Sequence, residues 1–179
     1  MNRLNLSVFA RPLPKKKGAE LAAEWLEYVG HLLITPEVMS MGQYDHHFAI
    51  SCYQHSVFVS FTAFRIAKRM GWDTRAAARS GLLHDLYLYQ PYDQNCHPGN
   101  QCLDHPLFAL MNARALCPDL TDGEQNAIAT HMWPLARHMP RCATAVAVTL
   151  ADKICASIEL LSRCRVGVIR RLLPAAVPV

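Results

Sequence analysis

The chain has 179 residues, of which 51% are hydrophobic and 18% charged, and its formal net charge is +4. This length corresponds to about one domain with a sizeable core, and the composition excludes a disordered or fibrous protein. The small positive charge suits an anionic small molecule but is well below the basic bias of a dedicated nucleic-acid binder.

The cysteines and the apolar segments bear on the compartment. Seven cysteines without a Cys-x-x-Cys pair favour free thiols in a reducing environment. The apolar stretch at 4–10 is short, and the lysines at 15–17 follow it, unlike the order in a signal peptide. Residues 46–64 contain no Asp, Glu, Lys or Arg, but they include three histidines, which favours a buried helix over a membrane span. We therefore expect a cytoplasmic protein without a membrane segment.

The first half of the chain predicts helices separated by short connections. Residues 1–16 form an irregular arm in this interpretation, because two prolines and the lysine run argue against an early element. The apolar spacing predicts a helix over 18–33, followed by a connection at 36–42. A second helix is expected over 51–70, ended by Gly71, and Asp73 is expected to cap a third that runs to about residue 85.

The second half begins with a long non-periodic stretch, 87–103, of the kind that is often functional in compact domains. Asp104 is expected to cap a helix over 105–116, and Thr121 with Glu124 to form a capping box for a helix ending near 131. Two more helices are expected, over 143–162 and 166–173, and we expect no strand. The prediction is an all-α single domain spanning 17–179.

Six histidines and aspartates recur along the chain in places that predict chemistry. Two of them sit inside apolar helical faces, and the other four sit at helix ends, where a helical bundle can gather side chains at one point. Neutral imidazoles and carboxylates are ligands for first-row transition metals. Six protein ligands exceed what one metal with an open position takes, so they indicate a pair of metals with Asp85 as the bridge. The six residues are His55, His84, Asp85, His105, His131 and Asp152.

This ordered set resembles the HD-domain metal-dependent phosphohydrolase superfamily, over roughly residues 45–165. The segments that carry the resemblance are Tyr53-Gln54-His55-Ser56, Gly81-Leu82-Leu83-His84-Asp85, Asp104-His105-Pro106, Thr130-His131-Met132-Trp133-Pro134 and Ala151-Asp152-Lys153. By the resemblance, His55, His84, Asp85 and Asp152 match the four common ligands, and His105 and His131 the two extra histidines of the binuclear branch. The spacing is also similar to that of symmetrical diadenosine tetraphosphate hydrolases.

The resemblance implies an HD-type helical bundle that hydrolyses a phosphoester or phosphoanhydride of a small nucleotide or phosphorylated metabolite through a metal-bridging hydroxide. It implies two divalent transition metals, with Fe or Mn preferred and Ni, Co, Zn or Mg as alternatives. His84, Asp85 and Lys153 are the expected catalytic residues, and Lys153 is expected either to meet a phosphate oxygen or to extend into solvent. The partner is a small anionic substrate, with no nucleic-acid polymer and no membrane.

Several alternatives stay open at this point. The same ligand set occurs in mixed-valent di-iron oxygenases of the superfamily, and an inactive metal-containing binding module would keep it too. Cys96, His97, Cys102 and His105 form a second, less specific metal pattern for a structural zinc. Polar side chains near the site are further candidates: His46 or His47 for a substrate or supporting role, and Arg79, Arg137, His138 or Arg141 for the mouth, although solvated surface is the simpler expectation for each of these four.

Overall fold

Helix α3 (Cys52–Met70) is the central element, and every residue from His55 to Ala67 is buried. It begins with a capping box, in which the Ser51 side chain accepts from the Gln54 amide and the Gln54 side chain accepts from the Ser51 amide. It ends at Gly71, whose φ of 71° is the left-handed conformation that glycine adopts without strain. The predicted helix and its end at Gly71 are confirmed, and the capping box at its start is an additional signal that was not predicted.

The computed structural model describes residues 12–47, 50–91, 100–136, 138–161 and 166–178, without the side chains of 47, 102 and 166. The elements besides α3 are α1 (Lys15–Leu33), α2 (Pro36–Ser40), η2 (Met41–Gln43), β1 (Asp45–His47), β2 (Ile50–Ser51), α4 (Thr74–Leu83), α5 (Gln101–Leu116), α6 (Asp122–Thr130), α7 (Ala143–Leu161) and α8 (Val166–Leu172). The described part of the chain is predominantly helical, so the all-α prediction is confirmed.

Helix α4 packs closely against α3 because the facing residues are small. A Cβ atom built at Gly81 would lie 2.9 Å from the Cα atom of Ser60 on α3. The Ser60 hydroxyl donates to the carbonyl oxygen of Ala78 and accepts from the indole N–H of Trp25, so α1 joins the same contact. Asp73 caps α4, with its carboxylate accepting from the amide of Ala76.

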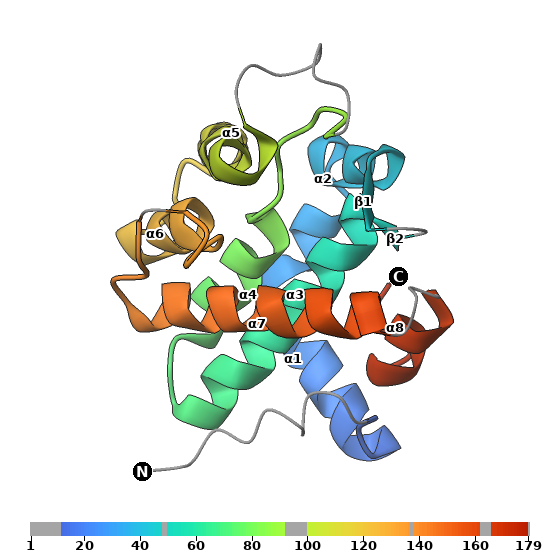
Figure 1. Ribbon diagram of the computed structural model, residues 1–179. Coiled ribbons are helices and arrows are strands. Elements are labelled where there is room, and N and C mark those ends of the chain that lie inside the picture. The colour runs from blue at the N-terminus through green and yellow to red at the C-terminus, as the bar shows by residue number, and fades with distance from the viewer. Residues whose placement is uncertain (1–11, 48–49, 92–99, 137, 162–165, 179) are drawn as a thin grey trace.

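Helix α7 runs across α3 and α4 and contacts both, as well as α6 (Figure 1). Helices α5 and α6 lie side by side on one side of the molecule, and α1 packs against α4. The buried apolar side chains of these helices form one cluster. The carboxyl-terminal ends of α4 and α6 and the middle of α7 therefore converge on one region of the interior.

Some predicted boundaries were wrong. Helix α1 begins at Lys15, not near Gly18, because Pro14 has the extended backbone of a residue just before a helix, and the lysines that follow are good helix formers. Helix α5 begins at Gln101, and Asp104 is therefore not its cap but lies in its first turn, accepting from the amide of Asn100.

The expectation of no strand was also wrong. Strands β1 and β2 form a short antiparallel pair just before α3, with Asp45 paired to Ser51. Three and two residues are too few to show the alternation by which a strand is recognised in a sequence. The connection predicted at 36–42 contains α2 and part of η2. None of the described helices is long and apolar enough to cross a bilayer.

Candidate metal centre

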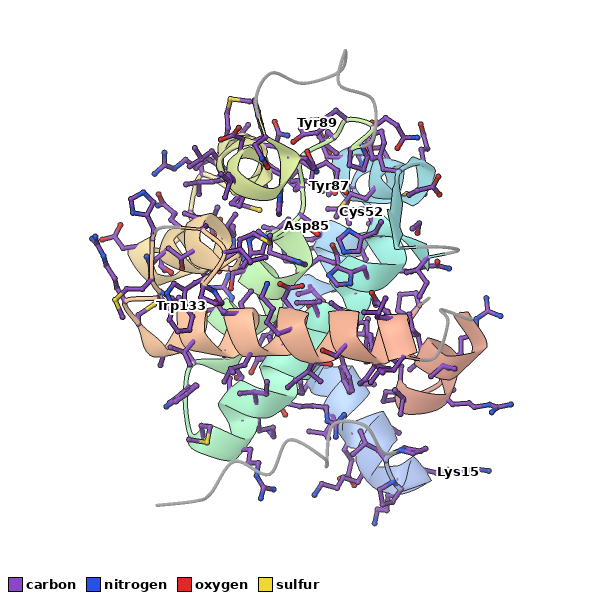
Figure 2. The ribbon with its side chains drawn as sticks, in the orientation of Figure 1. Lys15, Cys52, Asp85, Tyr87, Tyr89 and Trp133 are labelled. Carbon is purple, nitrogen blue, oxygen red and sulfur yellow. The ribbon has the colours of Figure 1, made fainter. Side chains whose placement is uncertain are left out.

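The six predicted ligands meet at one place. His55 lies on α3, His84 and Asp85 follow the last residue of α4, and His105, His131 and Asp152 come from α5, the end of α6 and α7, respectively. All six are buried. Figure 2 shows Asp85 in the interior between these helices, with Tyr87 and Tyr89 on the segment that leads away from it. One ligand atom from each member lies within 4.8 Å of the others in the groups His55–His84–Asp152 and His84–Asp85–His131.

Three of the histidine rings are oriented by the backbone of their own helices. The Nδ1 atoms of His84, His105 and His131 lie 2.9, 2.7 and 2.8 Å from carbonyl oxygens three or four residues earlier. A carbonyl oxygen only accepts, so each Nδ1 carries the hydrogen and donates. In a neutral ring the lone pair is then on Nε2, the nitrogen that faces the cluster. This is how metal-ligating histidines are commonly held.

His55 is oriented in the same way by a carboxylate. Its Nδ1 lies 2.9 and 3.0 Å from the two oxygens of Glu159, and both side chains are fully buried. Its Nε2 lies 3.3 Å from Oδ1 of Asp152. A carboxylate behind an imidazole fixes the ring and makes the opposite nitrogen a better ligand. Glu159 was not predicted, although it lies seven residues after Asp152, two turns along the same face of α7.

The Nε2 atoms of His105 and His131 are only 2.9 Å apart. With Nδ1 of each ring donating to a carbonyl, two neutral rings would bring two lone pairs face to face. A metal ion bound by both nitrogens would relieve this contact. In addition, Nε2 of His84 and Oδ1 of Asp85 are buried without a hydrogen-bond partner among the described residues. Buried polar atoms of this kind are costly unless something else satisfies them, and a metal ion fits these donors.

The two carboxylate oxygens of Asp85 face different histidines. Oδ1 lies 3.2 Å from Nε2 of His105 and 3.5 Å from Nε2 of His131. Oδ2 lies 3.4 Å from Nε2 of His84 and 3.5 Å from Nδ1 of His46. A carboxylate placed between two sets of imidazoles has the arrangement of a ligand that bridges two ions.

The electrostatics of the cluster favour positive charge inside it. Burial raises the pKa of the Asp85 carboxyl, but the neighbouring histidines outweigh it and hold the pKa well below its usual range. For His55 and His105, burial lowers the pKa, but the carboxylates beside them raise it overall. At His84, burial dominates and lowers the pKa to about 4. The cluster thus combines a carboxylate that stays ionised with two imidazoles, His55 and His105, whose positive charge the neighbouring carboxylates stabilise, and a divalent cation would be stabilised in the same way.

A cavity of about 390 Å³ opens beside the cluster. Four of the predicted ligands line it, together with His46 and the polar side chains Tyr87, Gln101 and Lys153. The remaining lining residues are apolar: Pro91, Met132, Leu135 and Ala156. Lys153 is partly exposed, and its Nζ lies 2.7 Å from Oδ2 of Asp152. The site is therefore open to a small molecule, with one lysine beside the candidate ligands.

His46 belongs to the cluster more closely than the sequence indicated. Its ring is stacked on that of His55, with the centroids 3.9 Å apart, and it lines the cavity. The available signal was its place in a polar segment, next to His47, shortly before α3. The side chain of His47 lies outside the described residues.

Three of the four cations proposed for the mouth of the site are described, and none of these three lines the cavity. Arg79 is buried and pairs with Asp119 and Glu124, so the expectation of a solvated side chain was wrong. His138 and Arg141 are exposed and do not line the cavity. Arg137 lies outside the described residues.

The alternative zinc pattern also falls outside the described structure, because Cys96, His97 and the side chain of Cys102 are not described. His105, the fourth member of that pattern, lies in the cluster with its Nε2 directed at Asp85 and His131. Of the seven cysteines, those at 52, 117, 142 and 155 are described and are free thiols.

Comparison of the chain with models of known families, with characterised proteins and with solved structures found no match. The fold and the cluster therefore define the class: an all-α protein with buried histidine and aspartate groups that could hold metal ions.

Proposed function

We propose that this protein is a metal-dependent phosphohydrolase of the HD type that cleaves a small phosphorylated metabolite or nucleotide. The observation that carries the proposal is the convergence of six buried histidines and aspartates, far apart in the sequence, beside one cavity that four of them line. The order of these residues is the one that resembles the HD superfamily. The cluster also lies beside an open cavity, which a purely structural histidine cluster would not need.

The residues present suit a pair of divalent ions. His55, His84 and Asp152 would hold one, His105 and His131 the other, and Asp85 would contribute an oxygen to each. When bound, two such ions supply an activated water and neutralise the charge that develops on a phosphoryl group. Glu159 and the backbone carbonyls behind the histidines hold the imidazoles in place, which reduces the reorganisation required on binding.

The cavity suits a substrate with one phosphoryl group and a less polar remainder. Lys153 is the only Lys or Arg among the described lining residues. Its Nζ, which donates to Oδ2 of Asp152, would instead donate to a phosphate oxygen of a substrate bound beside the cluster. Met132, Leu135 and Ala156 provide an apolar wall for the organic portion. In the hydrolysis, a water oxygen would bond to phosphorus, the bond between phosphorus and the leaving oxygen would break, and a proton from the water would pass to that oxygen, giving inorganic phosphate and an alcohol.

The test is phosphate release by protein loaded with Mn²⁺, Fe²⁺ or Co²⁺. p-Nitrophenyl phosphate represents monoesters, bis(p-nitrophenyl) phosphate represents diesters, and a panel of nucleotides extends the range. We expect monoester hydrolysis that is abolished by His84→Ala and His131→Ala and unchanged in His31→Ala, a control on the exposed face of α1.

The same assay separates the alternatives. Turnover that is equal with and without oxygen supports hydrolysis. Oxygen consumption by the iron-loaded protein, without phosphate release, would instead assign a di-iron oxygenase. A fully metal-loaded protein that turns over none of these compounds would contradict the proposal and favour a binding module.

A further inference from the structure

We propose that His46 is a seventh metal ligand, which completes the coordination on the Oδ2 side of Asp85 and leaves the Oδ1 side for substrate. The inference rests on the metal centre of the proposed function. It concerns a residue outside the set of six that the sequence indicated, on an element, β1, that the sequence did not predict.

The contacts of His46 match those of the predicted ligands. Its Nδ1 lies 3.5 Å from Oδ2 of Asp85, a distance like those that separate Asp85 from its other histidines. One ligand atom from each of His46, His55 and Asp85 lies within 4.8 Å of the other two, so this group is as compact as the two groups formed by the predicted ligands alone. The imidazole is stacked on His55 at an interplanar angle of 26°.

The position of His46 is set by the start of α3. Strand β1 pairs with β2, which leads directly into α3, and the amide of Cys52 at the start of α3 donates to the carbonyl oxygen of Tyr44. The hairpin is therefore anchored to the helix that carries His55. His46 lines the cavity, so it reaches the cluster from the cavity side.

Adding His46 makes the two sides of Asp85 unequal. On the Oδ2 side, four residues accompany Asp85: His46, His55, His84 and Asp152. On the Oδ1 side, only His105 and His131 do so among the described residues. First-row divalent ions bind four to six ligands. An ion with five protein donors has little room for substrate, whereas one with three has open positions. The substrate oxygen should therefore bind on the side of His105 and His131.

The experiment is a Co²⁺ titration of chelator-treated protein, followed by visible absorbance and by metal analysis after gel filtration. His46→Phe keeps an aromatic ring on His55 but removes the nitrogen, and His46→Ala removes both. His131→Ala perturbs the opposite side, and His31→Ala is the surface control. We expect two binding steps in the wild type. His46→Phe should weaken one step at least about tenfold, the size of loss seen when a residue that supports a metal centre is removed, and His131→Ala should weaken the other.

The outcomes separate this inference from the proposed function. Wild-type affinities for both ions in His46→Phe would overturn the role of His46, even if the enzyme is active. A defect in His46→Ala that His46→Phe restores would assign packing against His55 instead of ligation, and would also overturn it. A wild-type protein that binds no Co²⁺ would contradict the metal centre on which the proposed function rests, whatever the variants show.

Discussion

Glu159 provides a sharp test of how the cluster is held, because it touches a candidate ligand but would not touch the metal. Both of its oxygens lie about 3 Å from Nδ1 of His55, and both side chains are fully buried. Glu159→Gln keeps an oxygen that can accept from Nδ1–H but removes the charge. Glu159→Ala removes the acceptor and leaves a buried N–H without this partner.

The expected magnitudes follow from these contacts. Loss of a partner behind a metal-ligating histidine costs about tenfold to 100-fold in metal affinity, or about 1.4–2.7 kcal/mol. We expect Glu159→Gln near the lower value and Glu159→Ala at or beyond the upper one. In the metal-free protein, Glu159→Ala should also lose about 1–3 kcal/mol of unfolding free energy, because a buried donor loses its acceptor.

The assay is competition between the protein and a fluorescent metal indicator, with urea unfolding of the metal-free protein beside it. Glu27→Gln, an exposed carboxylate on α1, is the matched control and should change neither quantity. Wild-type metal affinity in both Glu159 variants would refute the reasoning, since either His55 would not be a ligand or its orientation would not depend on Glu159.

Three further predictions concern packing, substrate binding and protons. Gly81→Ala should destabilise the protein by about 1–3 kcal/mol in urea unfolding, because the new Cβ would lie 2.9 Å from the α3 backbone. The control is Gly30→Ala, which has no atom within 4 Å of its added Cβ and should be neutral or stabilising. Equal changes in unfolding free energy for the two variants would contradict the close contact at Gly81. Lys153→Met should keep the metal content but weaken inhibition by inorganic phosphate about tenfold or more, because a charge-assisted hydrogen bond from Lys153 to phosphate contributes about 1.5–3 kcal/mol. Unchanged inhibition would place Lys153 outside the phosphate site. Since the pKa values of His55 and His105 are raised, both hold protons in the metal-free protein to a higher pH than an ordinary histidine, and a metal must displace them. Metal affinity should therefore rise from about pH 6 to about pH 8, with proton release in calorimetry that depends on the buffer; an affinity independent of pH would contradict it.

The helices were predictable from the sequence because their signals are local. The Thr121–Glu124 capping box and the glycine at 71 each act within one turn, and each is present in the structure. The start of α5 was missed because Asp104 has the chemistry of a cap but is used inside the first turn.

Two of the six candidate ligands could be selected because His and Asp are unusual on apolar helical faces, and the other four because His and Asp recur at helix ends in an ordered set. The residues around them could not. In the sequence, Glu159 looks like an ordinary charged residue near the end of a helix, because its contact with His55 forms only when α7 packs against α3. His46 depends on a hairpin too short to predict. Arg79 was misjudged because its partners, Asp119 and Glu124, lie about forty residues later in the chain.

The measurement that tests the central claim most directly is the metal content of the protein purified without chelators, determined by mass spectrometry for the wild type, His84→Ala and His131→Ala. The account predicts about two transition-metal ions per chain in the wild type and fewer in both variants. One ion that survives His131→Ala would contradict the binuclear centre and remove His105 and His131 from the ligand set. No metal in a wild-type protein that also takes up none on addition would contradict the metal centre altogether.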